Sequence, residues 1–169
     1  MVSGIISDTL MFTSPTTTNY DKYVGERLSL ISGIDIKTYS KAMFKAGTNL
    51  AGKTIEEVIE SDTKTYDING KRVYISQVLT LNYEEILDKK DEYIEKLNEI
   101  KQNKGLDIVI LSITDLIKKG SYIYFDTNSF NIVGNCFKVE DIKEGHFFSK
   151  CLSRKFLWIF ALQNPHSIF

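Results

Sequence analysis

Several residue types that mark particular classes of protein are scarce in this sequence of 169 residues. Its two cysteines, Cys136 and Cys151, cannot build a disulfide framework and lack metal-ligand spacing, so a cytoplasmic location is expected. No apolar run approaches the roughly 18 residues of a membrane span. The segment Met1 to Leu10 has no basic residue ahead of its apolar ones, so no signal peptide is expected.

Neither sign of charge predominates. The chain has 21 Lys and Arg against 22 Asp and Glu, which leaves a formal net charge of -1. Such a balance gives no global field for attracting nucleic acid or an anionic membrane, and we expect neither as a partner. Hydrophobic residues make up 43% of the chain, enough to build a core, so a disordered chain is excluded.

The pattern of apolar residues predicts an α/β fold, a single domain with a mixed β-sheet and flanking helices. The turn pair Asn69-Gly70 between two β-branched runs predicts an antiparallel hairpin over 64–79. The continuous apolar run 106–113 predicts a central strand covered on both faces. Helices are expected at 3–12, 20–31, 36–46, 54–60, 82–103 and 129–137, and further strands at 122–125 and 145–152.

Few residues suggest catalysis by themselves. His146 and His166 are the only histidines and have no ligand spacing, so no metal centre is expected within this chain. Asp8 and Asp115 each end an apolar run, where a carboxylate acts either as a general base or as a cap for the following turn. The capping interpretation is favoured for both residues.

One basic pair, Arg154-Lys155, follows an apolar strand pattern instead of lying on a polar helix face. The planar fork of Arg and the mobile charge of Lys suit phosphate oxygens. A surface pair without any partner is the competing interpretation, because charged doublets are common on protein surfaces.

A resemblance to a known family is carried by Ser7-Asp8-Thr9-Leu10-Met11-Phe12-Thr13-Ser14-Pro15-Thr16-Thr17-Thr18. This segment closely resembles the SDTLLFKSPT segment of manganese-dependent (family II) inorganic pyrophosphatases, at the start of their C-terminal, second DHH-associated domain. The stretches 33–36, 46–50, 75–78, 106–111, 114–115 and 153–155 are similar to that domain as well. The resemblance covers residues 1–155 and leaves 156–169 as an atypical apolar tail.

What the resemblance implies is half of a two-domain enzyme that hydrolyses diphosphate to two phosphates. In that family an N-terminal DHH domain supplies the ligands of two manganese ions, and the C-terminal domain closes over the substrate. The implied partners are pyrophosphate or another polyphosphate anion and a DHH domain, and a homodimer is left open. The chain alone is expected to be inactive, since the manganese ligands would lie in the DHH domain.

The resemblance also assigns phosphate-binding residues. The Arg and first Lys of the family's SRKKQ motif fall on Arg154 and Lys155, and the Lys of FKSPT falls on Thr13. At Thr13 a neutral hydroxyl replaces a cation, which should weaken phosphate binding. After Lys155 the family's second Lys and Gln are replaced by apolar residues, starting at Phe156.

Two alternative functions are compatible with these departures. One is a non-catalytic module that binds phosphate or polyphosphate or has a regulatory role. The other is part of an exopolyphosphatase-like enzyme, since such enzymes resemble pyrophosphatases in their closing domain.

Overall fold

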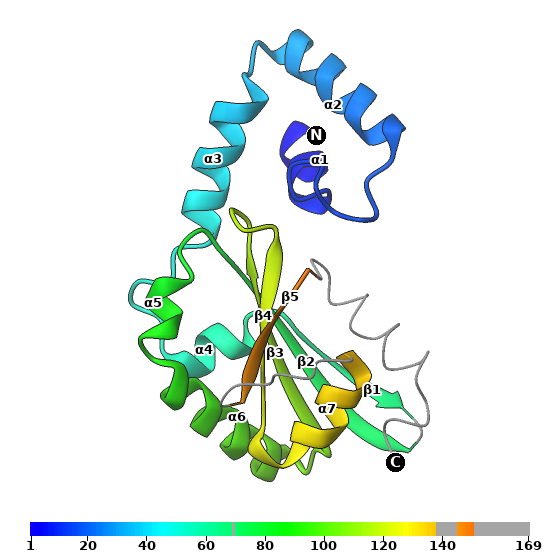
Figure 1. Ribbon diagram of the computed structural model, residues 1–169. Helices are drawn as coiled ribbons and strands as arrows, with labels where there is room; N and C mark the ends of the chain where they lie inside the picture. Colours follow the sequence, from blue (N-terminus) through cyan, green and yellow to red (C-terminus); the bar gives the residue numbers. More distant parts are fainter. Residues whose placement is uncertain (69, 138–144, 151–169) are drawn as a thin grey trace. The chain divides into compact units, whose positions relative to one another are not determined.

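The computed structural model describes residues 1–68, 70–137 and 145–150, and the chain forms two compact units, Met1–Asn49 and Leu50–Phe169 (Figure 1). The first unit is helical, and the second carries a five-stranded sheet with flanking helices. The predicted α/β class with a mixed sheet is confirmed.

The first unit consists of the helices α1 (Val2–Asp8), α2 (Asn19–Ser32) and α3 (Ile36–Gly47). Helix α2 begins with a capping box, in which the Thr18 hydroxyl accepts the Asp21 N–H and the Asp21 carboxylate accepts the Thr18 N–H. That backbone hydrogen bond from Thr18 holds the pKa of Asp21 below its usual value. Helix α1 ends at Asp8, earlier than the predicted residue 12, because Leu10, Met11 and Phe12 have left-handed backbone conformations.

The second unit contains the strands β1 (Thr63–Ile68), β2 (Lys71–Thr80), β3 (Ile108–Asp115), β4 (Gly120–Phe125) and β5 (His146–Ser149). They lie side by side in chain order, with β2 and β3 parallel and every other neighbouring pair antiparallel. All eight residues of β3 are buried, so the predicted central strand is confirmed. The predicted hairpin is confirmed by the pairing of β1 with β2; Asn69 lies outside the described residues.

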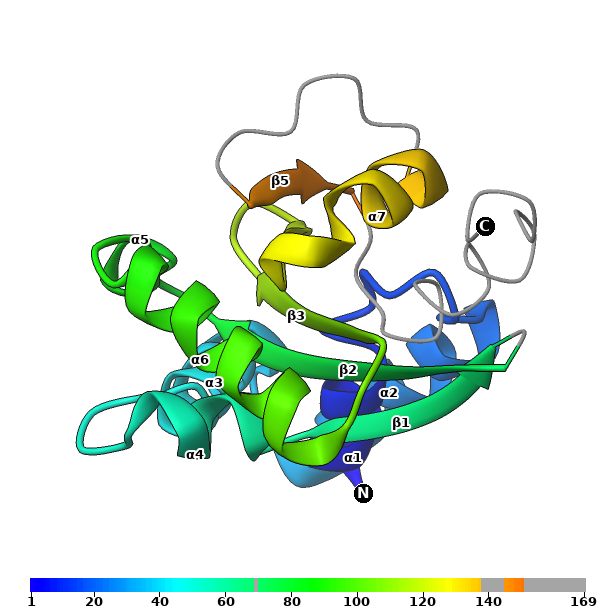
Figure 2. The same ribbon diagram turned by 90° about the horizontal axis from the view of Figure 1, so that it is seen from below.

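Helices cover both faces of the sheet (Figure 2). They are α4 (Ile55–Glu60), α5 (Glu84–Leu87), α6 (Lys90–Lys104), the 3-10 helix η1 (Thr127–Ser129) and α7 (Phe130–Phe137). On one face, Ile59 of α4, Ile86 of α5 and Leu97 of α6 pack in a single apolar cluster. On the other face, Val133 and Cys136 of α7 pack in a second cluster.

The prediction of one long helix over 82–103 is wrong in one respect: the structure has two helices, α5 and α6, separated by residues 88–89. No residue between Ile86 and Tyr93 is buried, so nothing apolar holds the intervening turn against the sheet. Since helices in proteins depend mainly on such packing, Lys89 leaves the helical conformation, with φ -113° and ψ 21°.

The far end of β4 is fastened to the start of β3 by Asp126, whose exposed fraction is 0%. One carboxylate oxygen accepts hydrogen bonds from the Val109 N–H at 2.9 Å and from the Ser129 hydroxyl at 2.6 Å. The other oxygen accepts a hydrogen bond from Lys101 Nζ at 2.6 Å. A single buried side chain thus connects β3, the end of β4, η1 and α6.

Candidate functional site

Three strands end at one edge of the sheet, which we call the carboxyl edge and define by Thr80, Asp115 and Ser149. Strands β2 and β3 are parallel, and β5 runs in the direction of β3 because both are antiparallel to β4. The β3–β4 turn, residues 116–119, lies at this edge as well, since Asp115 pairs with Gly120. Ligands of open α/β sheets commonly bind beyond the carboxyl ends of the strands. The carboxyl edge is therefore the first candidate for a binding site.

A chain of polar side chains crosses the sheet next to this edge. Gln77 of β2 donates from Nε2 to the Thr114 hydroxyl at 2.9 Å, and that hydroxyl is 2.9 Å from the Ser121 hydroxyl of β4. Ser112, on the same strand as Thr114, has 1% of its surface exposed, and its hydroxyl has no hydrogen-bond partner within the described residues. The sheet therefore changes from an apolar to a polar surface as it approaches the carboxyl edge.

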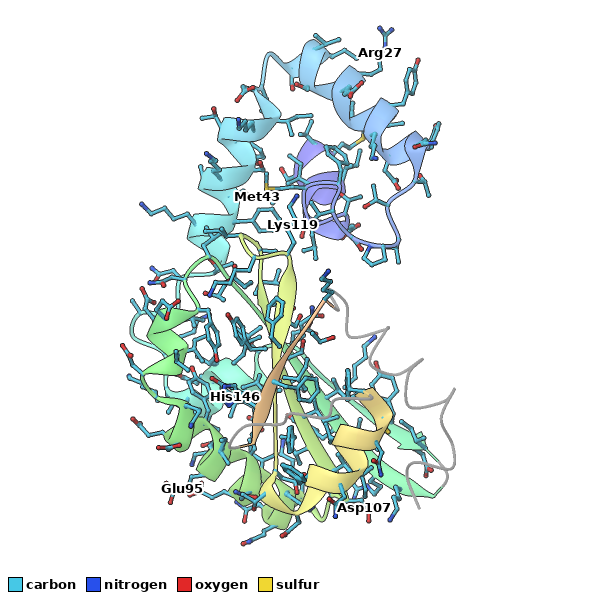
Figure 3. The ribbon with its side chains drawn as sticks, in the orientation of Figure 1. Arg27, Met43, Glu95, Asp107, Lys119 and His146 are labelled. Carbon is cyan, nitrogen blue, oxygen red and sulfur yellow. The ribbon has the colours of Figure 1, made fainter. Side chains whose placement is uncertain are left out.

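Asp115 shapes the β3–β4 turn. Its carboxylate accepts the Ile117 N–H at 2.8 Å and the Lys118 N–H at 2.9 Å, and the residue is only 3% exposed. The favoured interpretation of Asp115 as a cap is confirmed. The turn closes at Lys119, which has a left-handed φ of 53°. Figure 3 shows Lys119 and Asp107 at opposite ends of the sheet.

Lys118 is held by aromatic side chains. Its Nζ donates to the Tyr122 hydroxyl at 2.8 Å, lies 3.5 Å from a Glu84 carboxylate oxygen, and sits over the Tyr83 and Tyr122 rings. The hydrogen bond to Tyr122 raises the pKa of Lys118 above its usual value. The Tyr83 and Tyr124 hydroxyls are 2.6 Å apart, and burial raises the pKa of Tyr124 to about 12.

Thr13 lies in a turn of the first unit that the sequence did not reveal. Three successive residues, Leu10, Met11 and Phe12, have left-handed φ values of 46°, 56° and 61°. Left-handed conformations cost non-glycine residues roughly 1–2 kcal/mol each, and no glycine in the segment signals them. The turn is closed by hydrogen bonds from the Thr13 and Ser14 N–H groups to the Thr9 carbonyl, at 3.0 and 2.8 Å.

The side chain of Thr13 is occupied within this turn, because its hydroxyl donates to the Leu10 carbonyl. It cannot donate to a phosphate oxygen without giving up that bond. The turn also packs closely on α2: a Cβ placed on Gly25 would lie 2.7 Å from the end of the Phe12 ring. The turn therefore has a defined, hydrogen-bonded backbone, but at position 13 it carries a neutral hydroxyl where the resemblance implies a lysine.

Arg154 and Lys155 lie outside the described residues. The last described strand, β5, ends at the carboxyl edge, and the sequence continues from it through Lys150 toward this pair. The structure therefore adds Lys118, Lys119 and Lys150 to the basic residues of interest. Sequence reasoning missed them, because the direction of β5 and the position of the β3–β4 turn became known only with the strand pairing.

The described residues do not fit the manganese that the resemblance implies. Over 1–68, 70–137 and 145–150, no three His, Cys, Asp or Glu side chains come together as a metal site would require. His146 lies on β5 with its ring edge-on to Tyr124, and His166 lies outside the described residues. No chemical step is therefore assigned to a metal held by this part of the chain.

None of the described helices is long and apolar enough to cross a membrane.

Comparison with known proteins gives a consistent family pattern. The model of the DHHA2 domain matches residues 41–156. A "Probable manganese-dependent inorganic pyrophosphatase" of Clostridium acetobutylicum is 40% identical over 155 residues, which cover 92% of this chain and 50% of that protein. A "Cobalt-dependent inorganic pyrophosphatase" of Clostridium perfringens is 39% identical, with 92% of this chain and 28% of that protein covered.

A solved structure shares the fold. The crystal structure of a family II inorganic pyrophosphatase assigned in Methanococcus jannaschii superposes with a TM-score of 0.80 at 36% identity, covering 91% of this chain and 50% of the other. The chain thus spans about half the length of that protein and half or less of the length of the curated relatives it matches.

Proposed function

The chain belongs to the DHHA2 domain family, and from this we propose that it is the substrate-binding part of an inorganic pyrophosphatase that works together with a DHH domain. The observation that carries the proposal is the 40% identity to a pyrophosphatase across 92% of the chain. In this proposal residues 1–155 form the clamping domain and residues 156–169 an apolar tail. The proposed compartment is the cytoplasm, since two cysteines give no disulfide framework.

The proposed role of the chain is to bind and orient pyrophosphate. Arg154 would hold two phosphate oxygens with its planar fork, and Lys155 would add a mobile positive charge. Manganese or cobalt held by the DHH domain would activate the attacking water and offset charge on the phosphates. In this division of work the metal ligands would belong to the DHH domain, and the present chain would supply side chains that hold the phosphates.

Reconstitution tests this function. The full chain alone is expected to release no phosphate from pyrophosphate above background, whereas a mixture with a separately expressed DHH half of the Clostridium acetobutylicum relative should release it when manganese is added. Arg154→Ala should lower the reconstituted rate by roughly tenfold or more, since charge-assisted hydrogen bonds contribute about 1.5–3 kcal/mol. The measurement is phosphate release over time.

A matched control for Arg154→Ala is Arg72→Ala, which also removes one guanidinium. Arg72 donates to the Lys104 and Gly105 carbonyls, at the end of the sheet opposite the carboxyl edge. The reconstituted rate should survive this second change. Manganese-dependent turnover by the chain alone, or equal losses in the two variants, would contradict the proposed division of work.

Thr13→Lys should strengthen pyrophosphate binding by roughly tenfold at low salt. The substitution restores the cation that the family resemblance places there, and a charge-assisted bond outweighs the lost hydroxyl bond to Leu10. The measurement is calorimetric titration of pyrophosphate into the full chain. Thr16→Lys adds the same charge at a nearby exposed residue and should have a smaller effect. Equal gains in the two variants would mean that position 13 has no special role.

A second candidate function is a phosphate-binding module without catalysis. It is favoured by one observation: Thr13 carries a neutral hydroxyl, which donates to the Leu10 carbonyl, at the position where the resemblance places a lysine of the catalytic family. Under this alternative, pyrophosphate binds the chain, but no DHH half restores hydrolysis.

A further inference from the structure

We propose that Lys119 and Lys150 form an additional cationic contact for the phosphate chain at the carboxyl edge, beyond the residues that the family resemblance assigns. The inference rests on the proposed function and deepens it by naming further substrate-binding residues. Two observations support it: strand pairing places Lys119 and Lys150 close together, and neither ammonium group is paired with an acidic side chain within the described residues.

Strand pairing brings the two lysines to the same place. Ser121 of β4 pairs with Ser149 of β5, and the two strands are antiparallel. The backbones are also close here, because a Cβ placed on Gly120 would lie 2.8 Å from the Ser149 carbonyl oxygen. Lys119 directly precedes Gly120, and Lys150 directly follows Ser149, so the two residues flank this contact.

Lys119 and Lys150 differ from Lys118, whose ammonium group has bonding partners within the structure. Lys118 is bound to Tyr122 and Glu84, as described above. Lys119 and Lys150 are exposed, and within the part of the chain that the structure describes neither ammonium group has a hydrogen bond or ion pair. Asp115, the acidic residue at the start of the turn, accepts hydrogen bonds from the Ile117 and Lys118 N–H groups with one carboxylate oxygen.

The backbone at Lys119 supports a functional role. Its φ of 53° is a conformation that side chains other than Gly, Asn and Asp seldom adopt, and such residues cluster at ligand-binding positions. Because Asp115 fixes the turn, the lysine is presented in one backbone conformation. A fixed cation loses less freedom on binding an anion than one on a mobile loop.

The ligand that suits this pair is a compact anion with several charges. Two ammonium groups are point charges that attract phosphate oxygens through space without requiring one geometry. In water such an interaction is modest for each charge but scales with the charge of the ligand, so pyrophosphate should respond more strongly than inorganic phosphate. The pair would then favour the substrate over the product.

The test is titration of the full chain with pyrophosphate and with inorganic phosphate, followed by amide chemical shifts and calorimetry at two salt concentrations. Lys119→Ala and Lys150→Ala should each weaken pyrophosphate binding about threefold at low salt, and the double variant about tenfold. Phosphate binding should weaken less, and the double variant should depend less on salt. Lys64→Ala, on β1 at the other end of the strand order, is the matched control and should bind as the wild type does.

The outcomes separate the inference from the proposed function. Saturable pyrophosphate binding that Arg154→Ala weakens and the double lysine variant does not would overturn the inference and leave the proposed function standing. Equal weakening by Lys64→Ala would also overturn it, since the effect would then be one of overall charge. Absence of pyrophosphate binding in the wild type would contradict both. Circular dichroism checks that each variant is folded.

Discussion

Asp126→Ala is expected to lower the free energy of unfolding by about 3–5 kcal/mol. The substitution leaves the Val109 N–H and the Ser129 hydroxyl buried without their acceptor and removes the partner of Lys101. Breaking a buried ion pair by deleting one partner is among the most costly single changes, because the remaining groups lose solvation without compensation. Urea unfolding followed by circular dichroism measures the difference.

Glu84→Ala is the control for Asp126→Ala, because it removes one partner of an exposed ion pair instead of a buried one. Glu84 lies 3.5 Å from Lys118, and the two side chains are 68% and 45% exposed. An exposed pair of this kind contributes roughly 0–1 kcal/mol, so its loss should change stability little. Similar small losses in the two variants would show that Asp126 is not the fastening point between β3 and β4.

Gly120→Ala should destabilise the sheet by about 2–3 kcal/mol and loosen β5. A Cβ at this position would lie 2.3 Å from the end of the Phe148 ring and 2.8 Å from the Ser149 carbonyl oxygen. The ring can swing away, but the carbonyl belongs to the backbone and can move only if the β4–β5 pairing changes. Thermal unfolding and hydrogen exchange of the β5 amides are the measurements.

Gly4→Ala is the matched control for this substitution. Gly4 lies inside α1 with nothing within 4 Å of the added carbon, so alanine should stabilise the helix by about 0.5–1 kcal/mol. Combining Gly120→Ala with Phe148→Ala should not restore the wild-type stability, because the clash with Ser149 persists. A stable Gly120→Ala protein with protected β5 amides would contradict this description of the edge.

Local chemistry explains which parts of the fold the sequence could predict. The Asn69-Gly70 pair, the Thr54 cap and the apolar run of β3 each act over a few residues, and the structure contains the expected hairpin, helix and central strand. The division of the helix at Lys89 could not be predicted in this way, since it depends on the absence of packing against a sheet formed elsewhere in the chain.

The candidate site was less predictable for the same reason. The left-handed turn at Leu10 to Phe12 contains no glycine, and its form depends on packing such as that of Phe12 against Gly25. Lys119 and Lys150 are 31 residues apart in the sequence, and the pairing of Ser121 with Ser149 brings their backbones close together. The assignment of Arg154 and Lys155 to phosphate binding rests on the resemblance, and the reconstitution assay tests it.

The order of the strands bears on how the chain reaches this fold. Because β1 to β5 lie in the sheet in the order in which they are synthesised, each strand can pair with the one before it as the chain grows. The exception is the parallel pairing of β2 with β3, which must wait for residues 81–107 to form α5 and α6 and close the crossover. Closing that loop costs entropy before its contacts form, so this step should set the folding rate of the second unit.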